Sequence, residues 1–171
     1  MRVLILGSGG REHAIGWKIS SSSLLEALHF TPGNAGTAEA GINCDLDPLD
    51  FDAVEAHVRE HGIDMVVVGP EAPLAAGIVD HFVKAKGLES LAVIGPSKEG
   101  AQLESSKKFA KEFMKRHRIP TAKFGTFGKG QTRDALAFLK TMKAPYVVKA
   151  SGLAAGKGVI VTEDLKEAEQ A

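Results

Sequence analysis

The chain has 171 residues, of which 44% are hydrophobic and 25% charged, and its 21 basic side chains balance 21 acidic ones. This length suffices for one full domain and part of a second, and a net charge of zero excludes a general field that would attract nucleic acid or an anionic membrane. The one cysteine, Cys44, excludes an internal disulfide and is typical of a small buried side chain in a reducing cytoplasm. The apolar run after Met1 is too short for a secretory leader, and nothing approaches membrane-spanning length, so we expect a cytoplasmic protein.

The first predicted element is a strand followed by a tight turn and a helix. Apolar residues run from Val3 to Leu6, glycines occupy three of the next four positions, and apolar side chains recur at helical spacing from Ala14. The unbroken apolar run predicts a strand covered on both faces. Glycines let backbone amides approach a ligand closely, and a helix N-terminus attracts anions. We therefore expect Gly9, Gly10 and Arg11 to bind a phosphate group.

The turn departs from the dinucleotide-binding fingerprint. That fingerprint is G-x-G-x-x-G, with an acidic residue ~20 positions further on that binds the ribose. Gly7 and Gly9 fit it, but Glu12 stands at the third position, and the next strand carries no acidic residue at its tip. The sequence therefore disfavours NAD or FAD. A second alternative is a glycine turn that serves only the close packing of helix on strand.

Strands and helices continue to alternate up to about residue 96. Further strands are expected at Ala27–Phe30, Ile42–Cys44, Met65–Val68 and Leu91–Ile94, with helices at about Asp50–His61 and Leu74–Lys86. This alternation implies right-handed crossovers and hence an α/β fold with a parallel sheet. In such a sheet the loops that leave the carboxyl ends of the strands lie along one edge, where ligands bind.

Three loops are expected to share a crevice at this edge: Gly7–Gly10, Pro32–Thr37 and Gly69–Pro73. The candidate substrate-binding residues in them are Gly9, Gly10, Arg11, Asn34, Gly36, Thr37 and Glu71. These groups suit a phosphorylated, hydroxyl-bearing small molecule, with Arg11 or the amides on phosphate and Glu71 on hydroxyls or an amine. Because Glu71 lies between two prolines, a solvated loop residue is the alternative interpretation.

The composition changes at Gly95–Ser97, where we place a domain boundary. Ser97–Arg118 is strongly charged with Phe109 and Phe113 on one face, which predicts an amphipathic helix with a solvated charged face. A strand near Lys123–Phe127 and a helix from about Thr132 to Met142 are expected to follow.

A glycine-rich stretch, Ser151–Gly158, lies between the apolar segments Tyr146–Ala150 and Val159–Val161. It differs from a Walker loop in two ways. Three residues, not four, separate Gly152 from Gly156-Lys157, and Gly158 stands where the Walker motif has Ser or Thr. The β-branched residues on both sides predict a hairpin. Such a hairpin suits a triphosphate, with Lys149 reaching a phosphate from the strand; the alternative is an ordinary flexible hairpin.

With both loops described, the chain resembles the phosphoribosylamine-glycine ligase (glycinamide ribonucleotide synthetase) family of the ATP-grasp superfamily. The matching stretches are GSGGREHAIGWKI, PGNAGTA, VVVGPEAPLAAGIVD, IGP, QLESSKKFAKEFMKRHRIPTA and YVVKASGLAAGKGVIV. They follow the family's order and spacing over nearly the whole chain. Two positions depart mildly from the pattern, since Ser105 stands where glycine is common and Ser151 where aspartate is common.

The resemblance implies three parts and one activity. Residues 1–96 would form a Rossmann-like, substrate-binding N-terminal domain, 97–122 the linker and helix of the ATP-grasp A subdomain, and 123–171 an incomplete B subdomain. The implied reaction is the ATP-dependent ligation of glycine to 5-phosphoribosylamine through a glycyl phosphate, giving glycinamide ribonucleotide in purine synthesis. ATP and Mg²⁺ would be the cofactors, and the partners would be small molecules without nucleic acid or membrane.

The resemblance also assigns the ATP site. Lys107 and Lys149 would contact the phosphates of ATP, and a lid loop would cover them: Gly152, Leu153, Ala154, Ala155, Gly156, Lys157 and Gly158. Family members continue far past residue 171, so most catalytic residues and the Mg²⁺ ligands are expected there. Asp164 and Glu167 predict a helix start about two turns before Ala171, which suggests an N-terminal fragment that is inactive alone.

Two other functions stay open from the sequence. One is another purine-pathway ATP-grasp ligase, which should differ at PGNAGT and VGPEAPL. The other is a non-catalytic module that binds a nucleotide or a sugar phosphate.

Overall fold

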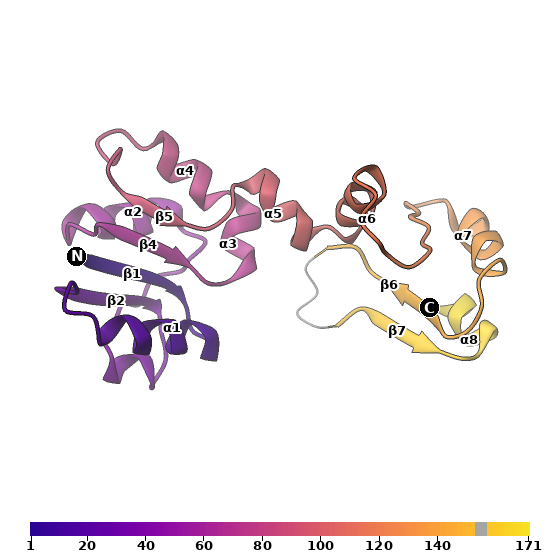
Figure 1. The fold of residues 1–171 in the computed structure, drawn as a ribbon, viewed down its shortest axis with the longest axis horizontal. Coiled ribbons are helices and arrows are strands. Elements are labelled where there is room, and N and C mark those ends of the chain that lie inside the picture. The colour runs from indigo at the N-terminus through magenta and orange to yellow at the C-terminus, as the bar shows by residue number, and fades with distance from the viewer. Residues whose placement is uncertain (153–156) are drawn as a thin grey trace. The chain divides into compact units, whose positions relative to one another are not determined.

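The computed structural model describes residues 1–152 and 157–171. They form two compact units, Met1–Ala101 and Gln102–Ala171, and each is described here by itself (Figure 1). Within these described ranges, no helix has both the length and the apolar character needed to cross a membrane. The domain limits expected at residues 96 and 122 stay predictions.

The first unit is built on a five-stranded parallel sheet in the order β3-β2-β1-β4-β5. Its strands are β1 (Arg2–Gly7), β2 (Ala27–Pro32), β3 (Ile42–Asn43), β4 (Met65–Val68) and β5 (Ala92–Ile94). β1 is central, with Leu4 opposite His29 of β2 and Val66 of β4. The five strands and their parallel arrangement confirm the α/β fold that the alternating pattern predicts.

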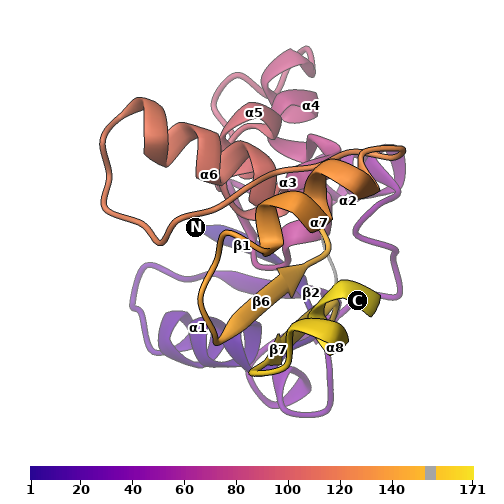
Figure 2. The ribbon, with the colours of Figure 1, turned by 90° about the vertical axis from the view of Figure 1, so that its right-hand side faces the viewer.

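Helices cover both faces of this sheet because alternate residues of β1 point in opposite directions. Leu4 and Leu6 belong to a core shared with α2 (Phe51–Glu60), α3 (Glu71–Ala76) and α4 (Ile78–Lys84). Val3 and Ile5 pack on the other side, against α1 (Gly10–Ser20). Figure 1 and Figure 2 show α1 on one side of the sheet and α2, α3 and α4 on the other. Fully burying each of these aliphatic side chains contributes roughly 1.5–3 kcal/mol.

The helix expected at Leu74–Lys86 is wrong in its limits. It is two helices, α3 and α4, separated by Gly77, whose φ of 107° is in the left-handed region. The amide of Gly77 donates to the carbonyls of Pro73 and Leu74, which ends α3. α3 begins earlier than expected, so Glu71 is in the first turn of a helix and not in a loop.

The charged stretch expected as one helix is also divided. α5 (Lys98–Ser105) and α6 (Lys107–Arg116) are separated by Ser106, whose extended backbone cannot continue a helix. The side chain of Ser106 accepts a hydrogen bond from the Phe109 amide, so Ser106 is the N-cap of α6.

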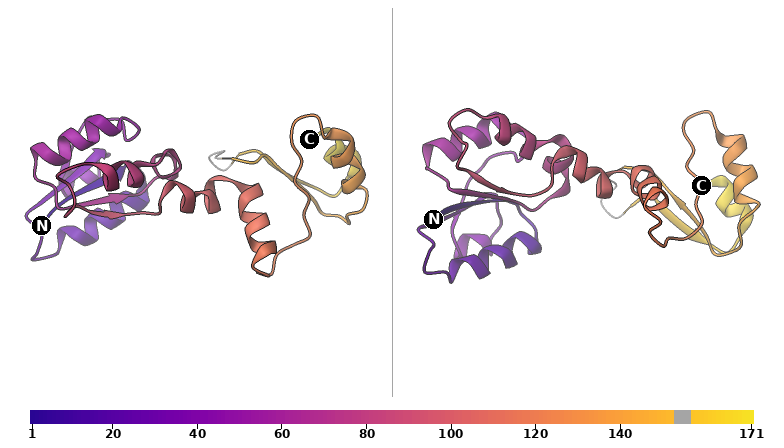
Figure 3. Two further views of the ribbon diagram at one scale, coloured as in Figure 1. Left: turned by 90° about the horizontal axis from the view of Figure 1, so that it is seen from above. Right: turned by 45° about the horizontal axis from the view of Figure 1, so that its top comes forward.

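The second unit contains an antiparallel pair, β6 (Tyr146–Lys149) and β7 (Val159–Thr162), with Lys149 opposite Val159. This pair confirms the predicted hairpin. α8 (Leu165–Gln170) contacts both strands and α7 (Thr132–Leu139), as Figure 3 shows. The carboxylate of Asp164 accepts from the Lys166 amide at 2.6 Å, so the predicted N-cap is confirmed.

The strand expected near Lys123–Phe127 is wrong. These residues have no strand pairing within the described chain. Phe127 instead lies with its ring centroid 5.7 Å from that of Phe138 in α7. The ring of Phe127 therefore lies beside a helix while staying 40% exposed, without the ladder hydrogen bonds of a sheet.

The structure adds one short element to those expected. A 3-10 helix, η1 (Thr37–Glu39), follows the loop after β2. It begins at one of the predicted site residues and shapes the edge of the sheet described next.

Candidate functional site

The predicted crevice lies at the carboxyl edge of the parallel sheet. β2, β1 and β4 are neighbours there, so the turns that follow them meet at the same edge. The Gly33 amide donates to the Gly7 carbonyl at 3.2 Å, and the Gly69 amide donates to the Leu6 carbonyl at 3.1 Å. The three loops that the sequence predicted to share a crevice are therefore adjacent.

Glu12 holds two of these turns together. The side chain of Glu12 is only 5% exposed, although it carries a carboxylate. One carboxylate oxygen accepts from the Gly9 amide at 2.7 Å, and the other accepts from Nε of Arg11 at 3.0 Å. This arrangement is half of a capping box, because Glu12 is the third residue of α1 and returns to the residue before the helix.

The glycines around Glu12 leave room for its side chain. A Cβ atom at Gly7 would lie 2.5 Å from Cγ of Glu12, and one at Gly69 would lie 2.3 Å from its Oε1. Gly7 also has a φ of 125°, which side chains rarely adopt. The residue that replaces the third fingerprint glycine thus fills the space between the β1 and β4 turns. The sequence signal for this role of Glu12 is the spacing Gly9-x-x-Glu12, which is the spacing of a capping box.

Arg11 and Glu71 reach each other from different turns. Nη1 and Nη2 of Arg11 lie 3.5 Å from Oε1 of Glu71, and the two side chains remain 55% and 38% exposed. The hydrogen bond with Glu12 raises the pKa of Arg11, and the charges of Glu12 and Glu71 add to this effect. The edge therefore offers a fixed positive charge beside a carboxylate, both accessible to a ligand.

The loop after β2 is organised by Asn34 and Thr37. The Oδ1 atom of Asn34 accepts from the amides of Gly36 and Thr37, and its Nδ2 donates to the Ser8 carbonyl at 2.8 Å. Thr37 is fully buried, and its hydroxyl donates to the Asn34 carbonyl and contacts Oδ1 of Asn43. These two side chains shape the loop and attach it to the first turn. Gly36 lies against His13, because a Cβ atom added at Gly36 would be 2.5 Å from Cε1 of the His13 ring.

The edge that results suits a phosphorylated ligand. A Cβ at Gly10 would meet nothing within 4 Å, so the start of α1 is open. The first-turn amides of a helix have no partner in the preceding turn and carry partial positive charge. Together with Arg11 they form a surface that attracts an anion, and Glu71 adds an acceptor for hydroxyls or an amine.

The predicted ATP residues lie in the second unit. Nζ of Lys107, at the start of α6, donates to the Gly152 carbonyl at 2.9 Å. Lys149 is exposed at the end of β6, three residues before Gly152, which Lys107 contacts. The Ala150 amide donates to the Gly158 carbonyl at 2.8 Å and extends the hairpin. Lys107 and Lys149 thus come from distant positions in the sequence to the same end of the hairpin.

The structure describes three of the seven residues of the predicted lid loop, Gly152, Lys157 and Gly158. Leu153, Ala154, Ala155 and Gly156 lie outside the described residues. Lys157 and Gly158 are described and exposed. An open hollow of about 620 Å³ elsewhere in the unit is lined in part by Glu112, Lys115, Arg118 and Phe124, and it includes no predicted ATP residue.

Comparison with known proteins agrees with both halves of this arrangement. A family model described as "Phosphoribosylglycinamide synthetase, N domain" matches residues 1–104. A second, "Phosphoribosylglycinamide synthetase, ATP-grasp (A) domain", matches residues 105–171. The parallel sheet with its glycine turns, followed by a glycine-rich hairpin, is thus that of an ATP-grasp protein. More narrowly, the chain belongs to the phosphoribosylglycinamide synthetase family.

Individual relatives are named as phosphoribosylamine-glycine ligases. Phosphoribosylamine-glycine ligases of Vibrio parahaemolyticus and Escherichia coli are each 49% identical over 173 aligned residues, which cover 100% of this chain. The chain spans 39% of the length of both.

Solved structures give the same fold. The phosphoribosylamine-glycine ligase of Thermotoga maritima matches with a TM-score of 0.73 and 36% identity, covering 99% of this chain and 38% of its own. The N5-carboxyaminoimidazole ribonucleotide synthetase of the same organism matches with a TM-score of 0.67 at 18% identity over 99% of this chain and 43% of its own. The second match shows the fold alone.

Proposed function

We propose that the protein to which this chain contributes ligates glycine to 5-phosphoribosylamine with ATP, giving glycinamide ribonucleotide, ADP and phosphate. The observation that carries the proposal is the end-to-end match of two consecutive phosphoribosylglycinamide synthetase models to residues 1–104 and 105–171. Another purine-pathway ATP-grasp ligase is disfavoured, because the stretches PGNAGT and VGPEAPL are both present.

The sheet edge would bind phosphoribosylamine. Arg11 and the open start of α1 at Gly10 would hold the 5-phosphate, and Glu71 would accept from ribose hydroxyls or from the amine. Asn34, with Gly36 and Thr37, would set the position of the loop that completes the crevice. Support comes from the adjacency of the three turns and from the exposure of Arg11 and Glu71.

The hairpin would bind ATP. Lys107 and Lys149 would contact its phosphates, with backbone groups of Gly152, Lys157 and Gly158 close to the triphosphate. The lid loop would include Leu153, Ala154, Ala155 and Gly156. Support comes from the contact between Lys107 and the Gly152 carbonyl, which brings one lysine to the hairpin beside the other.

In the proposed reaction, a carboxylate oxygen of glycine attacks the γ-phosphorus of ATP, and ADP leaves. The sugar amine then attacks the carbonyl carbon of the glycyl phosphate. A C–N bond forms, the C–O bond to phosphate breaks, and the amine loses a proton. Lysine charges lower the barrier because negative charge moves onto the leaving phosphate groups.

Mg²⁺ is expected with ATP, as the family resemblance implies. Mg²⁺ prefers oxygen ligands in octahedral geometry. We propose that the Mg²⁺ ligands and most of the glycine site lie in the part of the relatives that this chain does not span.

Labelled glycine tests the proposal. The full-length gene product is incubated with labelled glycine, ATP and freshly generated phosphoribosylamine, and anionic products are separated by ion exchange. We expect label in a phosphorylated product only when all three compounds are present. Label that enters without phosphoribosylamine would contradict the assigned acceptor.

A binding module without turnover is the second candidate for this chain alone, because the chain spans only 39% of its relatives. Thermal denaturation of the 171-residue chain with ATP, ribose 5-phosphate or NAD distinguishes the ligands. A ligand that binds only the folded state adds about 2.7 kcal/mol at a hundredfold its dissociation constant. We expect stabilisation by ATP and ribose 5-phosphate without glycine-dependent turnover; stabilisation by NAD alone would contradict the assignment of the first turn.

A further inference from the structure

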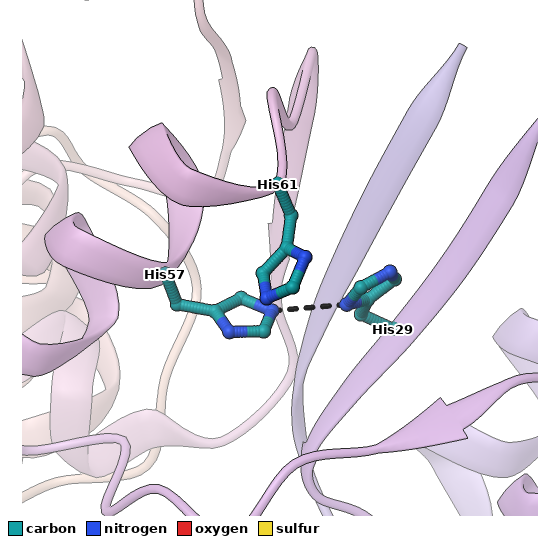
Figure 4. Close-up of side chains that lie close together, drawn as sticks. All are labelled: His29, His57 and His61. Carbon is teal, nitrogen blue, oxygen red and sulfur yellow. Dashed lines mark hydrogen bonds between the residues drawn. The ribbon is translucent and has the colours of Figure 1, made fainter.

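Three of the six histidines of the chain meet on the α2 side of the sheet. His29 is in the middle of β2, His57 is in the last turn of α2, and His61 is the residue that ends this helix (Figure 4). One ring nitrogen from each lies within 4.8 Å of those of the other two. Nδ1 of His29 is hydrogen-bonded to Nε2 of His57 at 2.9 Å.

Cys44 adds a fourth potential ligand. Its Sγ lies 3.6 Å from Nε2 of His57 and 3.8 Å from Nδ1 of His29. Zn²⁺ bond lengths in a tetrahedral site imply N···S separations of about 3.5 Å and N···N separations of about 3.3 Å. The sulfur distances are close to these values, and the two hydrogen-bonded nitrogens need to separate by only a few tenths of an ångström.

Burial lowers the pKa of His29, assisted by the charges of His61 and Arg2. Burial also lowers the pKa of His57, with His61 and His29 adding and Glu60 opposing. The proposal rests on the placement of the side chains, since one nitrogen from each histidine and the sulfur of Cys44 meet in one place.

Two further charges act on a cation at this place. The C-terminal end of α2 carries a partial negative charge, which favours a cation beside His57 and His61. The guanidinium of Arg2 acts against it. Burial raises the pKa of the Cys44 thiol. A cysteine binds metal as the thiolate, so binding through Cys44 would release a proton.

The cluster lies beside the middle of β2. Nη1 of Arg2, the first residue of β1, donates to the His61 carbonyl at 3.0 Å. Cys44 directly follows Asn43, whose side chain contacts Asn34 and Thr37 of the loop after β2. None of His29, His57, His61 and Cys44 is among the residues expected to bind the substrate.

We propose that His29, His57, His61 and Cys44 form a tetrahedral site for a divalent transition-metal ion such as Zn²⁺, bound beside the middle of β2 on the α2 side of the sheet. Imidazole and thiolate ligands select Zn²⁺ or Co²⁺ over Mg²⁺. The ion joins β2, α2 and the segment after β3, so its binding stabilises the first unit against unfolding.

Cobalt spectroscopy on the untagged, chelator-treated full-length protein tests this site. We expect Co²⁺ to bind with one equivalent and to give the intense visible bands of tetrahedral coordination and a thiolate-to-cobalt charge-transfer band in the near ultraviolet. One equivalent of Zn²⁺ then displaces the cobalt. Absence of the visible bands or of the thiolate band would overturn the four-ligand site.

Variants assign the ligands. His61→Gln is the main variant because His61 is partly exposed, His57→Gln is the second, and the exposed His117→Gln is the control. Competition with a chromophoric chelator measures the Zn²⁺ affinity, which we expect to fall at least tenfold in both variants. Losing a residue that only hydrogen-bonds a metal ligand already costs roughly 10–100-fold, so losing a ligand should cost no less. Circular dichroism without metal verifies that each variant is folded. Affinity that is unchanged in the folded His61 and His57 variants would overturn the proposal.

The sulfur ligand has its own variant. Cys44→Ser replaces sulfur with a hydroxyl that binds the metal poorly, so we expect the charge-transfer band to disappear and Zn²⁺ affinity to fall. A charge-transfer band that persists in Cys44→Ser would show that Cys44 is not the ligand, because the sequence has no other cysteine.

Discussion

Glu12 shows how one buried charge can set the shape of a binding edge. Its exposed fraction is 4%, and both of its carboxylate oxygens are hydrogen-bonded. A buried carboxylate is costly unless it is paired in this way. Here the pairing also fixes Arg11, one of the side chains expected to contact the substrate.

Glu12→Ala should destabilise the protein by about 1–3 kcal/mol, because it removes the acceptor of a partly buried amide and leaves a void between two turns. Urea unfolding followed by circular dichroism measures the loss. Glu39→Ala is the control, since Glu39 is exposed, and it should change stability by less than about 0.5 kcal/mol. Equal effects of the two variants would contradict the structural role of Glu12.

Gly69→Ala tests the contact between Glu12 and the β4 turn. The new Cβ would lie 2.3 Å from Oε1 of Glu12, so we expect a loss of about 1–3 kcal/mol from overpacking. In a Glu12→Ala background the obstructing side chain is gone, and the cost of Gly69→Ala should fall by at least about 0.5 kcal/mol, as expected for coupled neighbours. Additive effects would show that the glycine is needed for another reason.

The histidine cluster predicts a pH dependence of stability. The pKa of His29 and of His57 is lowered from 6.5, mainly by burial, so below this pH the unfolded chain binds more protons than the folded one. The free energy of unfolding should therefore be fully retained above pH 6.5 and fall as the pH decreases toward the lowered folded pKa values.

Urea unfolding at several pH values between ~5.5 and ~7.5, in the presence of a chelator, measures this dependence across the ordinary titration range of histidine. His57→Gln should make the slope shallower, whereas His117→Gln should leave it unchanged. A slope that is the same in all three proteins would contradict the assignment to the cluster.

At the scale of elements, Gly77 separates two helices that would otherwise be one. Its φ of 107° is unfavourable for any residue with a side chain, and its amide closes α3.

Gly77→Ala should cost about 1–2 kcal/mol, the penalty for a left-handed conformation in a residue with a Cβ. Gly77→Asn should cost less, because asparagine tolerates this conformation better. The two free energies of unfolding, measured in urea, provide the test. An asparagine variant as unstable as the alanine variant would show that the cost is steric contact with Lys98, 3.3 Å from the new Cβ, and not backbone strain.

Elements with a simple pattern could be predicted from sequence, and those determined by tertiary contacts could not. The apolar runs at Val3–Leu6 and Met65–Val68 predict strands, since both faces of the first are buried and the second is buried on one face and partly buried on the other. The divisions at Gly77 and Ser106 each depend on one backbone conformation inside a helical pattern. The segment near Phe127 resembles a strand locally, but its aromatic side chain packs on a helix.

For the molecule as a whole, the sequence predicts which loops share the sheet edge, because parallel topology determines it. It does not predict the use of each side chain. Thr37 is buried. Asn34 accepts hydrogen bonds from the amides of its own loop, because the backbone groups of a tight loop need partners. From the sequence, Glu12 is only the residue that replaces the third fingerprint glycine, and its buried role is not predicted. The histidine cluster is not predicted because its residues are far apart in the sequence.

Lys149→Met should reduce the kcat/KM for ATP of the full-length protein on the order of 10²-fold, as expected when one group that stabilises transferred charge is removed. Steady-state kinetics with varied ATP measures it. Lys143→Met, at another exposed position in the same unit, is the control and should retain activity. Equal activity of both variants would contradict the ATP contact proposed for Lys149.

The central claim is that the protein couples ATP cleavage to joining glycine and phosphoribosylamine. Phosphate release from ATP by the full-length gene product tests it most directly, with glycine and freshly generated phosphoribosylamine added separately and together. The account predicts steady release only when both are present. Release that is independent of glycine, or none with both substrates and Mg²⁺, would contradict it.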